Sequence, residues 1–262
     1  MDIIAHRGAS HEAPENTLAS VRLGWAQGAD AVEVDVRQSR DGHIVVIHDA
    51  HTRRTAGVTR RVRAETLDEL RALEVGRWKH RRHAGEKIPT LAEVIETVPP
   101  GKRLFVEIKS GPECLPQFVD TVKRSGKAPS QIVPIGFDLT TMKLVKWALP
   151  DCEVAWVQGF RRNWRGGWTP TAEKLIAQAK EAGLDALDVG GRAPVNQTFA
   201  AKVHAAGLNL YIWTVDSPAK AMRLAAAGVD GITTNRPGWL REKLARHGVP
   251  ALAGGASQTM PT

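Results

Sequence analysis

Three carboxylates lie within short apolar runs of the kind that form buried strands. Glu33 and Asp35 alternate with valines in AVEVDV (31–36), and Glu107 lies within LFVEIK (104–109). Residues two apart in a strand share a face, so Glu33 and Asp35 are expected to point the same way. Carboxylates that converge repel one another unless they are protonated, paired or bridged by a cation. Oxygen donors suit Mg2+ or Ca2+ better than zinc, so the sequence predicts one divalent cation.

Two histidines and two basic residues accompany these carboxylates. His6 and Arg7 end the first apolar run, His48 ends another, and Lys109 lies two residues after Glu107. An imidazole accepts or donates a proton near neutral pH, so His6 and His48 are predicted to form an acid/base pair. Arg7 and Lys109, with the cation, can hold a phosphate and stabilise charge on its oxygens. This set of groups fits hydrolysis of an anionic phosphodiester.

A simpler interpretation exists for each carboxylate taken alone. Glu33 or Asp35 could form a structural salt bridge with Arg7 or Lys109, but three carboxylates on inward faces of neighbouring strands favour a metal site. Six further histidines are interpreted as structural or exposed: His11, His43, His51, His80, His83 and His204.

The elements that must position these residues follow a regular alternation. Eight apolar runs are expected to form strands, at 3–6, 31–36, 104–109, 131–135, 153–157, 184–189, 208–213 and 229–234. Helical patterns lie between and after them, at 16–27, 90–98, 115–125, 140–148, 171–182, 196–206, 217–227 and 237–246. Many begin at capping residues, namely Asn16, Thr90, Thr140, Thr171, Asn196 and Ser217. Several end at glycine, namely Gly28, Gly183, Gly207 and Gly228.

Strand and helix repeated in this way favour α/β architecture with parallel strands. Eight units, and no glycine-rich phosphate loop after the first strand, favour a single (β/α)8 TIM barrel over an open doubly wound sheet. In a TIM barrel the carboxyl ends of the strands converge on one mouth, where barrel enzymes carry their chemistry. The predicted site residues are all expected at that mouth.

The alternation is interrupted once, after the second strand. Asp41-Gly42 predicts a hairpin turn, and 44–47 reads as a return strand that ends at His48-Asp49. Residues 50–88 then form a long basic insertion with one short helix, expected at 65–73. A connection of this length usually serves as a lid or a binding excursion.

Length and composition indicate one domain. The chain has 262 residues, 42% of them hydrophobic, enough to bury roughly 75% of the unfolded surface in one core. Residues 1–249, with the insertion, are expected to form the barrel, and the Ala-, Gly- and Ser-rich residues 250–262 to form a flexible tail. Cys114 and Cys152 have no metal-binding or redox spacing and are interpreted as buried thiols.

The net charge of +8 is concentrated in three clusters, at 53–63, 77–83 and 161–165. It fits an anionic small substrate, weak contact with a membrane surface, or nucleic acid, but no nucleic-acid-binding motif accompanies it. No apolar run approaches the ~20 residues of a membrane span, and no secretory signal is visible. The sequence therefore predicts a cytoplasmic protein with a small anionic substrate and no nucleic-acid partner.

The motifs and their order resemble those of bacterial, cytoplasmic glycerophosphodiester phosphodiesterases. They are HRG at 6–8, PENT at 14–17, EVD at 33–35, HD at 48–49, EIK at 107–109, WTVD at 213–216 and DGITTNRP at 230–237. The resemblance extends over residues 3–245 and includes the segment after His48, which returns to the barrel through IPTL at 88–91. One departure is Asn235, where the family usually has Asp.

The resemblance implies metal-dependent hydrolysis of glycerophosphodiesters such as glycerophosphocholine or glycerophosphoethanolamine to sn-glycerol 3-phosphate and an alcohol. In the family's mechanism the glycerol 2-hydroxyl attacks phosphorus, and water then opens the cyclic phosphate. The implied roles are metal ligation by Glu33, Asp35 and Glu107, acid/base catalysis by His6 and His48, and substrate binding by Arg7, Lys109 and Trp213. Asp49 would orient His48 or support the metal ligands from behind, and Trp213 would pack on the glycerol or simply fill space.

Three rival functions are open at this stage. One is lysophospholipase D-like hydrolysis of lysophospholipids, another is a non-catalytic phosphate-binding barrel, and the third is a nucleic-acid phosphodiesterase. The loop 158–168, rich in Trp and Arg, is interpreted either as a contact for a choline-like cation or a lipid surface, or as a locally packed loop. The choice of Mg2+ or Ca2+, the preferred alcohol, the oligomeric state and the order of the two histidines are left open.

Overall fold

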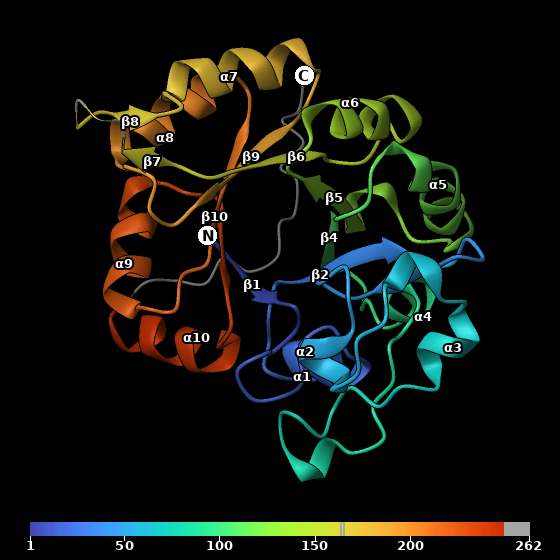
Figure 1. Ribbon diagram of the computed structural model, residues 1–262. Helices are drawn as coiled ribbons and strands as arrows, with labels where there is room; N and C mark the ends of the chain where they lie inside the picture. Colours follow the sequence, from blue (N-terminus) through green and yellow to red (C-terminus); the bar gives the residue numbers. More distant parts are fainter. Residues whose placement is uncertain (163, 165, 249–262) are drawn as a thin grey trace.

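The computed structural model describes residues 1–162, 164 and 166–248, so the predicted tail at 250–262 lies outside the described residues. Within them, eight parallel strands form a closed barrel in the order β1-β11-β10-β9-β6-β5-β4-β2, and pairing of β1 with β2 completes the ring (Figure 1). These strands are β1 Asp2–His6, β2 Ala31–Gln38, β4 Arg103–Ile108, β5 Ile132–Gly136, β6 Ala155–Gln158, β9 Ala186–Gly190, β10 Asn209–Trp213 and β11 Gly231–Thr234. The prediction of a TIM barrel is confirmed.

The helices form an outer ring around this barrel (Figure 1). They are α1 Leu18–Ala26, α4 Leu91–Glu96, α5 Leu115–Arg124, α6 Leu139–Ala148, α7 Ala172–Glu181, α8 Gln197–Ala205, α9 Pro218–Ala227 and α10 Pro237–Arg246. Single 3-10 turns precede α5 (η3 Pro112–Cys114) and β5 (η4 Pro129–Gln131). Each expected strand and helix is present at its predicted place, because the apolar pattern of each segment matches its burial.

Two of the predicted capping residues are wrong. Thr17, not Asn16, caps α1, since its side chain accepts a hydrogen bond from the Ser20 N–H. Asp138, not Thr140, caps α6, and Thr140 lies inside the helix. The other four predicted caps accept hydrogen bonds as expected: Thr90, Thr171, Asn196 and Ser217.

The inward faces of the strands divide the barrel into an apolar floor and a polar mouth. The floor is a buried cluster of Ile4, Ala31, Phe105, Val133, Ile135, Ala155, Val157, Ala186 and Tyr211. Two residues further along five of these strands, on the same face, stand polar or aromatic side chains: His6, Glu33, Glu107, Asp188 and Trp213. A separate, larger apolar cluster lies between the strands and the surrounding helices. The barrel thus presents a chemically distinct layer at its carboxyl end.

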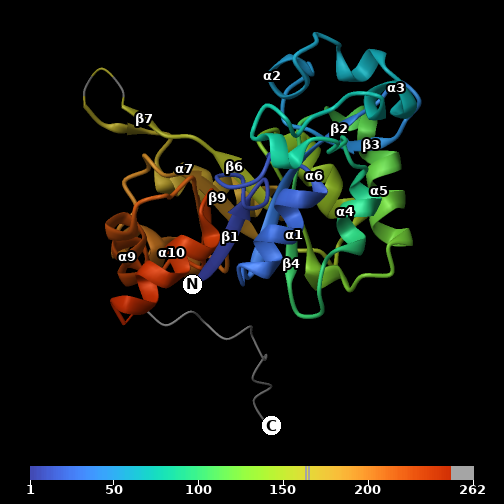
Figure 2. The ribbon, with the colours of Figure 1, turned by 90° about the horizontal axis from the view of Figure 1, so that it is seen from below.

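The insertion after β2 rises above this mouth. The return strand β3 Ile44–Val46 pairs antiparallel with β2, and the insertion that follows contains α2 Arg53–Ala56, η1 Val62–Ala64, α3 Leu67–Arg71 and η2 Arg81–His83. Only one short helix was predicted, so α2 and the two 3-10 turns correct that expectation. The insertion has its own apolar cluster, made of Val45, Ile47, Val62, Leu70, Val75 and Ile88. Figure 2 shows it at the end of the barrel opposite the N-terminus, which places α2 beside the carboxyl ends of the strands.

The loop at 158–168 contains a short hairpin that extends beyond the barrel (Figure 2). Strands β7 Arg161–Arg162 and β8 Trp168–Thr169 pair antiparallel, and the Arg162 guanidinium lies 5.3 Å from the centre of the Trp168 ring. Trp168 also packs against the larger apolar cluster. The two cysteines are buried and free, as expected. Among the described residues, no helix is both long and apolar enough to cross a membrane.

Candidate active site

A strained turn after β1 aims the backbone at the carboxylates. Arg7 has φ 55° and Gly8 has φ 77°, both in the left-handed region. A Cβ at Gly8 would lie 2.3 Å from the carbonyl carbon of Ser20, so only glycine fits there. The turn directs the Arg7 N–H at Glu33, and the N···Oε2 distance is 2.9 Å.

Asp35 is held in place by Asn16. The Asn16 side chain donates from Nδ2 to Asp35 Oδ2 at 2.8 Å, and its Oδ1 accepts from the Asp35 N–H at 3.1 Å. Asn16 itself has φ 58°, a conformation that asparagine tolerates better than most residues. Both residues are buried, so this paired hydrogen bond fixes the carboxylate rigidly.

The three predicted ligands converge. Glu33, Asp35 and Glu107 each offer a carboxylate oxygen, and these oxygens lie within 4.8 Å of one another. Burial raises the pKa of Glu33 well above its ordinary value, and the carboxylates of Asp35 and Glu107 raise it further. Burial and Asp35 also raise the pKa of Glu107. For Asp35 the effect of burial is outweighed by Arg7, Lys109 and His48, so its pKa lies below the ordinary value.

The salt bridges considered as an alternative are also present. Arg7 Nε lies 3.0 Å from Asp35 Oδ2, and Lys109 Nζ lies 3.1 Å from Asp35 Oδ1 and 2.5 Å from Glu107 Oε1. Neither contact to Asp35 has hydrogen-bonding geometry, since Arg7 Nε and Asp35 Oδ1 both remain without such a partner among the described residues. These ion pairs therefore compensate part of the negative charge of Asp35 and Glu107, but none of them involves Glu33.

The donor set fits a divalent cation. Glu33 Oε1 is buried and has no hydrogen-bond partner in the described part of the chain. An unpaired buried carboxylate oxygen beside two other carboxylates is costly unless a proton or a cation compensates it. Three carboxylates and no sulfur or imidazole donor suit a hard ion. Glu33, Asp35 and Glu107 could thus hold a divalent metal ion.

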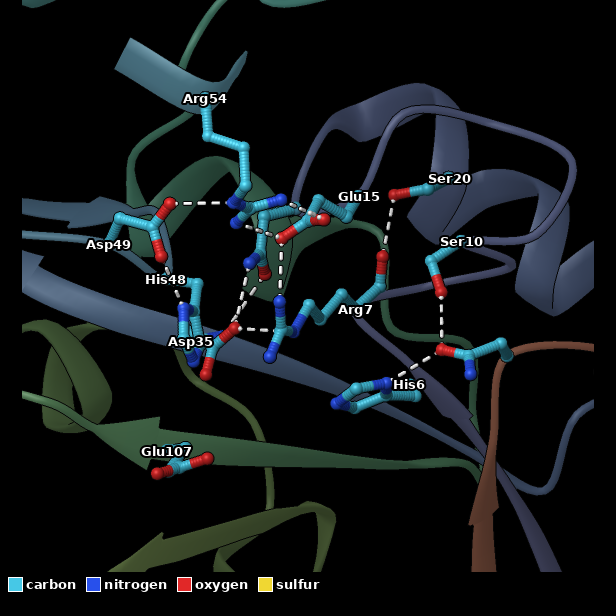
Figure 3. A network of polar contacts seen from close by, with 12 residues as sticks. His6, Arg7, Ser10, Glu15, Ser20, Asp35, His48, Asp49, Arg54 and Glu107 are labelled. Atoms are coloured by element: carbon cyan, nitrogen blue, oxygen red, sulfur yellow. Dashed lines mark hydrogen bonds and ion pairs between the residues drawn. The ribbon is translucent and has the colours of Figure 1, made fainter. Parts of the chain in front are cut away.

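A chain of ion pairs connects this cluster to His48 (Figure 3). Arg7 Nη1 donates to Glu15 Oε1 at 2.7 Å, and Glu15 accepts two further bonds from Arg54, at 2.6 and 2.8 Å. Arg54 Nε donates to Asp49 Oδ2 at 2.7 Å, and Asp49 Oδ1 lies 2.7 Å from His48 Nδ1. Arg54 belongs to α2, so the insertion helps to position a histidine at the barrel mouth.

The partner of each histidine defines which ring nitrogen is free. Burial would raise the pKa of Asp49, but Arg54 and His48 outweigh it, so Asp49 is an ionised acceptor of the His48 Nδ1 proton. His6 Nδ1 lies 2.7 Å from Asn235 Oδ1. Burial lowers the pKa of His6, and the nearby Arg7 cation lowers it further. In both rings Nε2 is left for chemistry.

Two cavities meet at His6 and Arg7. A cavity of about 170 Å³ lies inside the mouth and is lined by His6, Arg7, Glu33, His48, Glu107, Lys109, Ile135, Phe137, Val157, Asp188, Trp213 and Thr233. A more open one of about 450 Å³ is lined by His6, Arg7, Ser10, His11, Glu15, Trp78, Lys79, Asp216, Asn235 and Arg236. Of the predicted site residues, Asp35 and Asp49 line neither cavity and lie behind the others.

Residues 6–239 match the family model for glycerophosphoryl diester phosphodiesterases. The chain belongs to this family. It is 32% identical over 243 residues to a glycerophosphodiester phosphodiesterase of Caldanaerobacter subterraneus, covering 90% of this chain and 94% of that protein. A Bacillus subtilis glycerophosphodiester phosphodiesterase is 29% identical over 252 residues, covering 89% of this chain and 83% of that protein. The resemblance to the family noted from the motifs is confirmed.

Solved structures agree with this assignment. An Oleispira antarctica phosphodiesterase, determined in complex with the product sn-glycerol-3-phosphate, superimposes with a TM-score of 0.83 at 26% identity, covering 94% of this chain and 97% of that one. The chain is accordingly an enzyme, a phosphodiester hydrolase that acts on glycerophosphodiesters. A non-catalytic phosphate-binding barrel is not supported.

Sequence reasoning missed several residues of this phosphodiesterase site. Asn16 was interpreted as a helix cap, Glu15 was noticed only as part of a motif, and Arg54 was counted only within a basic cluster. Asp188 was also missed, although its position in the run LDALDV is the same signal that identified Glu33. The contact between Asn235 and His6 joins residues 229 positions apart, and nothing local in the sequence marks it.

Proposed function

We propose that this phosphodiesterase cleaves its substrate with His6 and His48 as the acid/base pair and one divalent cation, Mg2+ or Ca2+, on Glu33, Asp35 and Glu107. The observation that carries the proposal is the convergence of the three carboxylate oxygens within 4.8 Å, with Glu33 and Glu107 lining the same cavity as both histidines. Arg7 and Lys109 line the same cavity and supply positive charge for a phosphate.

The environments of the two histidines support different roles. Burial and the Arg7 cation lower the pKa of His6 and outweigh the bond to Asn235, which raises it, so the uncharged ring with a free lone pair on Nε2 is favoured. His48 Nδ1 donates to the ionised Asp49, which fixes the orientation of the ring. Groups whose surroundings differ in this way divide into base and acid. We therefore assign His6 as the base and His48 as the acid.

The reaction then balances in two steps. In the first, His6 Nε2 takes the proton of the glycerol 2-hydroxyl, its oxygen bonds to phosphorus, and the phosphorus–alcohol bond breaks while His48 protonates the departing oxygen. In the second, water opens the cyclic phosphate with the two histidines in reversed roles, which yields sn-glycerol 3-phosphate. Arg7 and Lys109 stabilise the charge that builds on the phosphate oxygens. A bound divalent cation would supply further electrostatic stabilisation of that charge.

Release of glycerol 3-phosphate from glycerophosphocholine and glycerophosphoethanolamine tests this proposal. The assay is run in EDTA and with added Mg2+ or Ca2+, for the wild type and for His48→Ala. We expect metal-dependent release that falls by at least about 100-fold in His48→Ala. His51→Ala, at an exposed position three residues along, is the matched control and should keep wild-type activity. Full activity in EDTA, or in His48→Ala, would contradict the proposal.

As part of the same proposal, the loop at 158–168 makes weak contact with a membrane surface. Trp164 has 86% of its surface exposed, whereas Trp168 is held by Arg162 and the apolar cluster. Liposome binding and headgroup preference of Trp164→Ala, compared with Trp168→Ala, measure this contact. Unchanged binding in both variants would reduce the hairpin to a locally packed loop.

A further inference from the structure

Asp188 is a buried carboxyl at the mouth that the proposed mechanism does not use. It lies in the middle of β9, with Val157 and Tyr211 as its neighbours on the adjoining strands. Only 3% of its surface is exposed, and it lines the cavity of about 170 Å³. The interior residue below it on the same face is Ala186, part of the apolar floor. Asp188 is therefore aimed into the cavity from an otherwise apolar strand.

No group in the described residues satisfies this carboxyl. Asp188 Oδ1 is buried and lacks a hydrogen-bond partner there, and no ion pair reaches the side chain. Asp35 differs, because Arg7 and Lys109 both approach it. Burial raises the pKa of Asp188 well above its ordinary value, and Glu107 raises it further. A buried polar group of this kind calls for a partner that the folded chain does not itself provide.

The barrel geometry separates Asp188 from the candidate metal ligands. In the closed ring, β9 is four strands from β2 in either direction, so Asp188 faces Glu33 and Asp35 across the mouth. It does not belong to the group of carboxylates whose oxygens lie within 4.8 Å. Phe137 and Trp213 line the same cavity and pack edge to face, with their ring centres 5.7 Å apart. A molecule bound in the cavity, between Asp188 and the three carboxylates, could therefore supply the missing partner.

We propose that Asp188 binds the terminal hydroxyl of the substrate's glycerol and makes the enzyme select substrates in which that hydroxyl is free. The inference rests on the proposed function, which puts the 2-hydroxyl and the phosphate near His6 and Arg7. A hydroxyl can donate to an ionised carboxylate or accept from a protonated one, so it suits Asp188 in either state.

The same feature disfavours an acylated substrate. An ester oxygen at the terminal position has no proton to donate, and an acyl chain brings apolar surface against a buried carboxyl. Asp188 thereby distinguishes a glycerophosphodiester from the lysophospholipid that a lysophospholipase D-like enzyme would take.

The test compares two substrates that differ only in this hydroxyl. They are glycerophosphocholine and its analogue 2-hydroxypropyl phosphocholine, which keeps the attacking hydroxyl and lacks the terminal one. We expect kcat/KM of the wild type to fall about 10- to 100-fold on the analogue. In Asp188→Ala, kcat/KM for glycerophosphocholine should fall by a similar factor, whereas kcat/KM for the analogue should stay close to the wild-type value. The variant should therefore no longer prefer glycerophosphocholine. Asp188→Asn, which can still bond a hydroxyl, should retain part of the preference.

The controls separate this inference from the proposed function. Asp151→Ala, an exposed aspartate outside the cavity, should leave both rates unchanged. Equal losses on both substrates in a folded Asp188→Ala would show a structural role and overturn the inference, as would wild-type cleavage of lysophosphatidylcholine at the rate of glycerophosphocholine. Failure of the proposed function differs in kind, because it would appear as full activity in EDTA or in His48→Ala, whichever of the two substrates is used.

Discussion

His6 Nδ1 and Asn235 Oδ1 lie 2.7 Å apart, and a third residue fixes which atom of the Asn235 amide faces the ring. Asn235 Nδ2 donates to Asp216 Oδ2 at 2.7 Å. The bonds from Asn235 and Thr234 outweigh the effect of burial and keep the pKa of Asp216 below its ordinary value, so this carboxylate only accepts. The amide oxygen of Asn235 must therefore face His6, and His6 Nδ1 carries the proton. His6 Nε2 is left as the basic atom.

Exchanging the amide and the carboxylate should move the pH dependence of the reaction. Asp216→Asn combined with Asn235→Asp preserves the amide–carboxylate bond but puts the negative charge against His6. Because a neighbouring carboxylate favours the imidazolium, the pKa of His6 rises. In the wild type the lowered pKa keeps His6 neutral to a pH below about 6.5, so the acid limb of kcat/KM should shift to higher pH in the variant.

Ser10→Ala is the matched control for this exchange. It removes the 2.9 Å bond from Ser10 Oγ to the same Asn235 oxygen without adding charge, and should leave the pH profile in place. A shift of the alkaline limb alone would instead make His6 the acid.

Glu33→Gln should affect the metal-free protein and the metal-bound protein in opposite ways. The folded-state pKa of Glu33 is raised, so in EDTA its carboxyl costs stability above its ordinary pKa of about 4.5, and this cost vanishes at lower pH. The variant should be more stable than the wild type near pH 7, and the difference should disappear as the pH falls below the ordinary pKa of Glu33. Thermal unfolding in EDTA across this pH range measures the difference.

With metal present, the order should reverse. A cation that binds only the folded state stabilises it by about 2.7 kcal/mol at 100 times its Kd. Addition of Mg2+ or Ca2+ should raise the Tm of the wild type and leave that of Glu33→Gln nearly unchanged. A metal-induced rise of the same size in both proteins would remove Glu33 from the ligand set.

Most of the fold could be predicted from the sequence because each barrel strand has a recognisable local pattern. Runs such as IVPI (132–135) are apolar on both faces, as is typical of strands covered by helices, and glycine or a cap marks the helix ends. The same logic placed Glu33 and Glu107 at the mouth, since a carboxylate inside a buried run needs a partner and several in neighbouring strands favour a site. Asp188 follows that rule as well and could have been found by it.

The remaining site residues depend on contacts that no local pattern encodes. Asn16 is a normal cap residue by type, and only its positive φ and its bonds to Asp35 reveal its role. Arg54 is one of many arginines in the insertion, and its selection depends on how α2 packs over the mouth. The partner of His6 lies at the other end of the chain. Such residues become visible only when the barrel closes.

Substitutions at Asn16 should separate backbone strain from the loss of hydrogen bonds. Asn16→Gly tolerates φ 58° but loses both bonds to Asp35, whereas Asn16→Ala loses the bonds and is also strained. We expect a cost of about 1–3 kcal/mol for the lost bonds and roughly 1 kcal/mol more for alanine than for glycine. Urea unfolding of the three proteins measures these differences. Alanine as stable as glycine would show that the conformation at residue 16 relaxes.

Arg54→Ala should lower activity without unfolding the protein. The change removes the bonds that join Glu15 to Asp49, so His48 loses the support that orients its carboxylate partner. Because 43% of the Arg54 side chain is exposed, its ion pairs contribute little to stability. Loss of an orienting partner typically costs about 10- to 100-fold in activity, and we expect kcat to fall in that range with little change in Tm. Arg53→Ala, on the same helix and exposed, has no ion pair among the described residues and should behave as wild type. A comparable loss of kcat in Arg53→Ala would point to the charge of α2 as a whole rather than to the orientation of His48.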